Sequence, residues 1–107
     1  MPEIPPTPTL TDLQVYQSAI CKARGWDKTS DSDTFLLFME EIGELAKAIR
    51  KRKNLYIEKK KAAVPSDLEG EFADVLSYLL ELANRFEVNL EKAYRDKEAE
   101  NAGRVWE

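Results

Sequence analysis

Residues 66–86 read SDLEGEFADVLSYLLELANRF, and this stretch decides the class of fold. Ser66 as a cap, Glu69 three positions later and Pro65 just before predict a helix that runs to about Phe86. Its apolar positions are Leu68, Phe72, Val75, Leu76, Leu79, Leu80, Leu82, Ala83 and Phe86. At 100° per residue they cover an arc of roughly 200°, wider than the stripe of a one-sided surface helix. We therefore expect this helix to be packed on two sides, with a second copy of the chain completing the packing.

Three more helices are predicted around it. The first begins near Thr9 or Thr11, where Thr11 and Gln14 fit a capping box, and stops at Gly25. A second runs from about residue 33 to 53 with an apolar stripe of period 3.6. A fourth runs from about Asn89 to Gly103. The sequence thus predicts an all-α, four-helix bundle-like fold.

The remaining segments are polar. Residues 1–8 are rich in proline and read as an extended tail, which leaves residues 9–107 as one domain. Residues 54–64 form a connector that contains Lys59, Lys60 and Lys61, unless the helix before it extends into this stretch. Together with residues 50–53 these lysines form a basic run, which is either a solvated surface or a region that attracts a polyanionic substrate.

Composition excludes several classes of function. The net charge of −4 and the absence of a long apolar run argue against nucleic-acid and membrane partners. The chain has no histidine, so His-based catalysis and the usual zinc sites are excluded. Cys21 is the only cysteine, and we expect it to be a buried apolar residue in a reducing, cytoplasmic compartment.

Two acidic pairs remain as candidates for chemistry. Glu41 and Glu44 are three residues apart on one predicted helix, and Glu71 and Asp74 are three apart on another. Each pair therefore shares a helix face and flanks an apolar stripe. If the two helices pack antiparallel through these stripes, the four carboxylates meet at the edge of the seam. Spacing alone leaves solvated helix faces as an equally good interpretation.

Four carboxylates in one partly buried place repel one another. At 4 Å and an effective dielectric constant near 20, one like-charged pair costs on the order of 4 kcal/mol. Protonation or a bound cation must relieve this repulsion. Ligands that are all hard oxygens favour Mg²⁺ or Mn²⁺ over soft metals.

With these motifs in view, the sequence resembles the MazG-type all-α nucleoside triphosphate pyrophosphohydrolases, close to short single-domain members similar to dCTP pyrophosphatase. The family pattern Glu-Glu-x-x-Glu followed by Glu-x-x-Asp reads here as residues 40–44 and 71–74. Supporting stretches are residues 24–26, 41–46 and 74–79, and the element Lys97-x-x-x-Asn101-x-x-Arg104. The resemblance covers residues 19–106.

The resemblance implies a reaction and a site. A nucleoside triphosphate and water give a nucleoside monophosphate and pyrophosphate with Mg²⁺, as a step that removes unwanted nucleotides from the pool. Glu41, Glu44, Glu71 and Asp74 match the metal ligands and catalytic residues of the family. Its triphosphate-binding positions match Lys97, Asn101 and Arg104, whose alternative role is an exposed polar helix face. The family also implies homodimers or dimers of dimers.

Two aromatic residues match the base pocket of the dCTP-cleaving relatives. These are Trp26 and Tyr78, for which core packing is an equal alternative. The relatives have an aromatic residue seven positions after the second ligand, where this chain has Lys51, so we expect a different base pocket. Three roles stay open for Glu40: it contacts a metal-binding side chain without touching the metal, it orients a water as a base, or it is simply exposed.

Two rival functions stay open at this point. One is a related pyrophosphohydrolase that cleaves dUTP or phosphoribosyl-ATP. The other is a non-catalytic helical interaction module that kept the fold.

Overall fold

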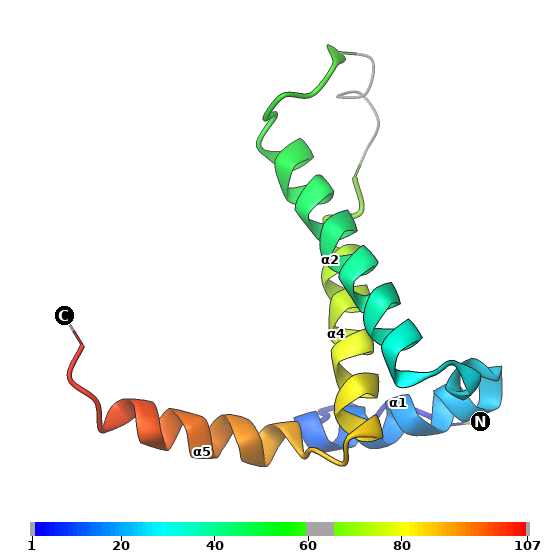
Figure 1. Cartoon of the computed structure of the whole chain (residues 1–107), viewed down its shortest axis with the longest axis vertical. Coiled ribbons are helices and arrows are strands. Elements are labelled where there is room, and N and C mark those ends of the chain that lie inside the picture. Colours follow the sequence, from blue (N-terminus) through cyan, green and yellow to red (C-terminus); the bar gives the residue numbers. More distant parts are fainter. Residues whose placement is uncertain (1, 60–65, 107) are drawn as a thin grey trace. The chain divides into compact units, whose positions relative to one another are not determined.

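The computed structural model describes residues 2–59 and 66–106, and the prediction of an all-α protein is confirmed. Within these residues there are four α-helices, one short 3₁₀ helix and no strand (Figure 1). They are α1 (Leu10–Arg24), η1 (Trp26–Lys28), α2 (Asp31–Arg52), α4 (Leu68–Arg85) and α5 (Leu90–Ala102). None of these helices combines the length and the hydropathy that crossing a lipid bilayer requires. Lys60, Lys61 and Pro65 lie outside the described residues.

The described residues fall into two compact units. Unit 1 contains α1, η1, the last part of α4 and α5, within residues 1–28 and 80–107. Unit 2 contains α2 and the first part of α4, within residues 29–79. Residues 2–8 form no helix or strand. The division into a tail and a single domain from residue 9 stays a prediction.

In unit 1, helix α1 begins one residue after Thr9, which is one of the two predicted starts. The Thr9 hydroxyl accepts a hydrogen bond from the Asp12 backbone N–H, and the Thr9 N–H donates to the Asp12 carboxylate, both at 3.0 Å. The predicted capping box of Thr11 with Gln14 is therefore wrong, and Thr9 with Asp12 forms it instead. The predicted stop at Gly25 is confirmed, because this residue closes the helix with a φ of 72°.

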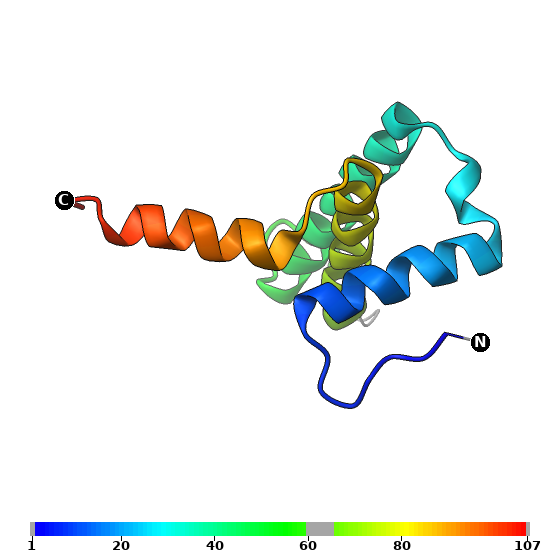
Figure 2. The ribbon, with the colours of Figure 1, turned by 90° about the horizontal axis from the view of Figure 1, so that it is seen from below.

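The Gln14 side chain forms hydrogen bonds with residues 84–90, which lie 70 or more positions later in the chain. Its Nε2 donates to Asn84 Oδ1 at 3.1 Å and to the Val88 carbonyl at 2.8 Å. Its Oε1 accepts from the Leu90 N–H at 2.8 Å, and Asn84 Nδ2 donates to the Gln14 carbonyl at 2.8 Å. This partly buried network joins α1 to the end of α4 and to the turn before α5. Figure 2 shows the backbone of these segments.

The apolar core of unit 1 comes from α1 and the end of α4. Cys21 is 3% exposed, so the expectation that it is buried is confirmed. Burial, followed by the nearby Glu81 carboxylate, raises the pKa of its thiol above the ordinary value. Glu81 is itself buried and accepts from Arg85 Nη2 at 2.9 Å. The other buried apolar side chains are Ile20, Leu80, Leu82 and Ala83.

In unit 2, helix α2 starts two residues before the predicted Asp33 because Ser30 caps it. The Ser30 hydroxyl accepts from the Asp33 N–H at 3.1 Å. At the other end the helix stops at Arg52 and does not extend into the connector. Arg50 Nη1 donates to the carbonyls of Leu55 and Tyr56 at 3.0 and 2.9 Å, which folds the chain back at that point.

Helix α4 begins at Leu68, and its cap is Asp67, so the prediction that Ser66 caps it is wrong. Asp67 Oδ1 accepts from the Gly70 N–H at 3.0 Å, which is the bond that an N-cap side chain makes. Serine and aspartate cap equally well, so the residue types alone do not choose between these neighbours. Helix α5, by contrast, begins and ends where predicted, with Asn89 as its cap and Gly103 after its end.

Candidate metal centre

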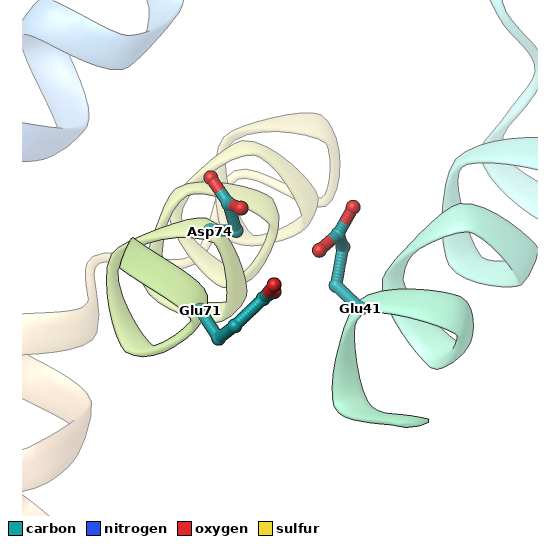
Figure 3. Close-up of side chains that lie close together, drawn as sticks. All are labelled: Glu41, Glu71 and Asp74. Carbon is teal, nitrogen blue, oxygen red and sulfur yellow. The ribbon is translucent and has the colours of Figure 1, made fainter. Parts of the chain in front are cut away.

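Three carboxylates come together where α2 and the first part of α4 lie side by side in unit 2. The two segments run antiparallel (Figure 1). Glu41 projects from α2 toward Glu71 and Asp74, which lie one turn apart on α4 (Figure 3). One oxygen from each of these side chains lies within 4.8 Å of the others. The cluster therefore joins one acidic pair to a member of the other.

The electrostatics of the cluster are those of crowded like charges. Glu41 and Glu71 are partly buried, and Asp74 is exposed. Desolvation, followed by the charge of Asp74, raises the pKa of both glutamates above the ordinary value of 4.5. Each of the two glutamates is thus harder to ionise than a free glutamate, and a nearby cation would favour the ionised form of both.

Glu44 and Glu40 stand beside this cluster rather than in it. Both are exposed on α2. The charge of Glu44 contributes to the raised pKa values of Glu41 and Glu71, while Glu40 acts on Glu41 alone. Glu44 is close enough to act electrostatically, although its oxygens are not among the three that lie within 4.8 Å.

The three residues fit a hard divalent cation. All donors are carboxylate oxygens, which suits Mg²⁺ or Mn²⁺ and gives no soft ligand. Asp74 opens to solvent, so a bound ion could keep waters or accept phosphate oxygens, as Mg²⁺ usually does. The donor set and the raised pKa values of the two glutamates agree with a cation site.

The three residues expected to bind phosphate lie on or just after α5 in unit 1. Lys97 Nζ lies 3.6 Å from Glu100 Oε2, and Arg104 pairs with the other oxygen of the same carboxylate. Asn101 lies between them, and its Oδ1 is buried without a hydrogen-bond partner. Its backbone carbonyl accepts from Trp106 Nε1 at 3.0 Å. In unit 1, Lys97 and Arg104 therefore share the Glu100 carboxylate, and the Asn101 amide oxygen makes no hydrogen bond.

The two aromatic residues expected to contact the base lie in different units. Trp26 is 52% exposed in η1, and the Arg24 guanidinium lies over its ring at 4.7 Å from the centroid. Tyr78 is partly buried on α4, one turn after Asp74. Lys51 is partly buried in the last turn of α2.

One acidic residue near the cluster was missed by pattern analysis. Asp67 precedes Glu71 by one turn, and its charge contributes to the raised pKa of Glu71. The signal that could have found it is the spacing Asp-x-x-Gly at the start of a helix, because glycine at the third position leaves room for the capping carboxylate.

In this all-helical protein, two adjacent antiparallel helix segments bring together an acidic cluster that could hold a metal ion. The family described as the MazG nucleotide pyrophosphohydrolase domain matches residues 30–98, well over half of the chain. The chain therefore belongs to this family. The matched span contains Glu41, Glu71 and Asp74. A comparison with curated protein sequences finds no match.

Proposed function

We propose that this protein is a Mg²⁺-dependent nucleoside triphosphate pyrophosphohydrolase that converts a ribo- or deoxyribonucleoside triphosphate to the monophosphate and pyrophosphate. The observation that carries the proposal is the convergence of Glu41, Glu71 and Asp74 inside the span that matches the family. Removal of surplus or noncanonical nucleotides in the cytoplasm is the role that fits this reaction.

In this proposal the carboxylates hold the metal and orient the attacking water. Glu41, Glu71 and Asp74 bind the cation, and Glu44 completes the set from the next turn of α2. When bound, Mg²⁺ would neutralise charge on the phosphates and make an attacking water easier to deprotonate. Glu41 or Glu44 accepts a hydrogen bond from the water and aims it at the α-phosphorus. Glu40 supports Glu41 from the neighbouring position.

The remaining roles fall to the substrate-binding residues. Lys97, Asn101 and Arg104 grip the triphosphate, since a lysine point charge and an arginine fork both suit phosphate oxygens. Lys97 and Arg104 both pair with the Glu100 carboxylate, so a bound triphosphate would compete with Glu100 for these two side chains. Trp26 and Tyr78 stack on or enclose the base.

Association of two or more copies is part of the proposal. On α4, Phe72 is 54% exposed, and Leu76 and Leu79 are 40% and 42% exposed. On α2, Phe35 and Met39 are about half exposed. Large apolar side chains exposed along both helices favour a dimer or a dimer of dimers, because monomers rarely leave such surface in water.

A substrate screen tests the proposal directly. The protein is incubated with Mg²⁺ and a nucleotide panel that includes dCTP, dUTP and phosphoribosyl-ATP, and both the nucleotide product and the released phosphate species are identified. Monophosphate and pyrophosphate are expected, and release of orthophosphate would refute the cleavage point. Preference for dUTP or phosphoribosyl-ATP would assign the related activity instead.

A pair of matched variants separates the site from the fold. Glu71→Gln should nearly abolish turnover, while Glu69→Gln, the same change two residues away on α4, should leave it unchanged. Normal turnover in Glu71→Gln would remove this residue from the site. No turnover with any nucleotide and no stabilisation by Mg²⁺ would favour a non-catalytic interaction module.

A further inference from the structure

The first turn of α4 is closed by Asp67, one turn before Glu71. Asp67 Oδ1 accepts from the Gly70 N–H, and the Asp67 carbonyl accepts from the Glu71 N–H, both at 3.0 Å. The bond from Glu71 closes a full helical turn on the capping residue itself. The backbone position of Glu71 is thus held from the cap.

Gly70, which has no Cβ atom, leaves space that the Asp67 carboxylate occupies. A Cβ atom built on Gly70 would lie 2.0 Å from Asp67 Oδ2 and 2.6 Å from Asp67 Cγ. Real Cβ atoms do not approach other atoms so closely, so any larger residue at this position would push the carboxylate away. The backbone angle of Gly70 is not what requires glycine, because its φ is not in the left-handed region. Glycine leaves room for the capping carboxylate in its present place, and a side chain here would make the far end of Asp67 shift.

Resting on the proposed metal site, we propose that Asp67 and Gly70 form a positioning pair that fixes Glu71 for metal binding. Glu71 is the first residue of α4 whose side chain belongs to the carboxylate cluster, and it stands where a helix frays most easily. The cap bonds prevent that fraying. Neither residue touches the metal; both act through the placement of Glu71.

Two other accounts give different expectations. If Asp67 is an ordinary cap, its loss lowers stability but not metal affinity beyond what the loss of any cap in unit 2 does. If its negative charge merely attracts the cation, asparagine at this position should be as harmful as alanine. Asparagine keeps the cap, because its side-chain oxygen accepts the same bond.

The experiment measures Mn²⁺ binding to the full chain by calorimetry, without nucleotide, together with thermal unfolding. Asp67→Ala should raise the Mn²⁺ dissociation constant by roughly fivefold, the equivalent of losing a typical cap. Asp67→Asn should stay within about twofold of the unchanged protein, since the cap survives. Ser30→Ala, which removes the cap of α2 in the same unit, should lower the unfolding temperature similarly without changing Mn²⁺ affinity.

Gly70 supplies an independent arm. Gly70→Ala should weaken Mn²⁺ binding about as much as Asp67→Ala, because the added methyl group displaces the carboxylate. In an Asp67→Ala background the same change should add no further loss, since the atom it collides with is gone. Additive losses would overturn the pairing of the two residues.

The outcomes also separate this proposal from the one it rests on. If the unchanged protein takes up no Mn²⁺, the metal site itself fails. If it binds Mn²⁺ and the Asp67→Ala variant binds equally well, only the positioning role fails. Equal losses in Asp67→Ala and Asp67→Asn would assign the effect to charge and overturn the role of the cap.

Discussion

Replacement of Glu41 by glutamine should change stability in opposite directions with and without metal. Glu41 faces the two carboxylates of α4 across the helix seam, and their charges help to raise its pKa. Without a cation, glutamine removes a repelling charge at constant size. With a cation, the same change removes a ligand. A carboxylate that is merely exposed would show neither effect.

The magnitude follows from the cluster geometry. A like charge 4.8 Å away, the limit within which the Glu41 and Asp74 oxygens lie, costs about 0.9 kcal/mol at the dielectric constant of water. The value for water applies because Asp74 is exposed. The metal-free variant should therefore unfold roughly 4–8 °C higher than the unchanged protein. For the unchanged protein, Mg²⁺ at about 100 times its dissociation constant should add about 2.7 kcal/mol.

Differential scanning fluorimetry with chelator and with Mg²⁺ or Mn²⁺ measures both effects. The unchanged protein should gain stability on metal addition, and the Glu41→Gln variant should gain little. Glu69→Gln serves as the control, because Glu69 is exposed on α4 and does not contribute to the pKa of Glu41. Destabilisation of the metal-free Glu41→Gln variant, or an undiminished metal response, would refute the reasoning.

Three further outcomes are expected. Glu41 and Glu71 have folded-state pKa values above 4.5, so at these two residues the folded metal-free protein binds more protons than the unfolded chain. In urea unfolding, their contribution to stability should therefore grow as pH falls toward 4.5 and be lost as pH rises through the folded-state pKa values. Mn²⁺ should reverse this trend, because protons compete with the metal. Gln14→Ala should cost about 2–4 kcal/mol in urea unfolding, since it leaves the Leu90 N–H and two carbonyl-type partners without their bonds. Cys21 should react with iodoacetamide slowly in the folded protein and rapidly in urea, because it is buried and its thiol pKa is raised; equal rates in both conditions would contradict its burial.

Local signals in the sequence were enough to predict most helix ends and to predict that each of the two acidic pairs shares a helix face. Gly25, Asn89 and Gly103 act through bonds within a few residues, so their roles could be predicted from residue type and spacing. The meeting of Glu41 with the pair on α4 could be predicted only under the condition that the helices pack antiparallel, which the structure supplies.

The failures have physical causes at particular residues. Thr11 and Gln14 fit a capping box by spacing, but Gln14 bonds partners 70 and more positions away, which no local pattern encodes. Ser66 and Asp67 are equivalent caps by type, and only the structure shows that Asp67 accepts the bond from the Gly70 N–H. Which oxygens of the four predicted ligands come together depends on side-chain geometry, and Glu44 shows that equal spacing does not give equal distance.

The hydrogen bonds of Gln14 have a consequence for how the chain folds during its synthesis on the ribosome. Unit 1 is discontinuous in the chain, with its two parts on either side of unit 2. As synthesis proceeds from the N-terminus, α2 and the start of α4 are complete while α1 still lacks the partners of Gln14. Because the partners of Gln14 are made after unit 2, unit 1 closes late in synthesis, and a chain stalled before residue 90 does not reach this closure.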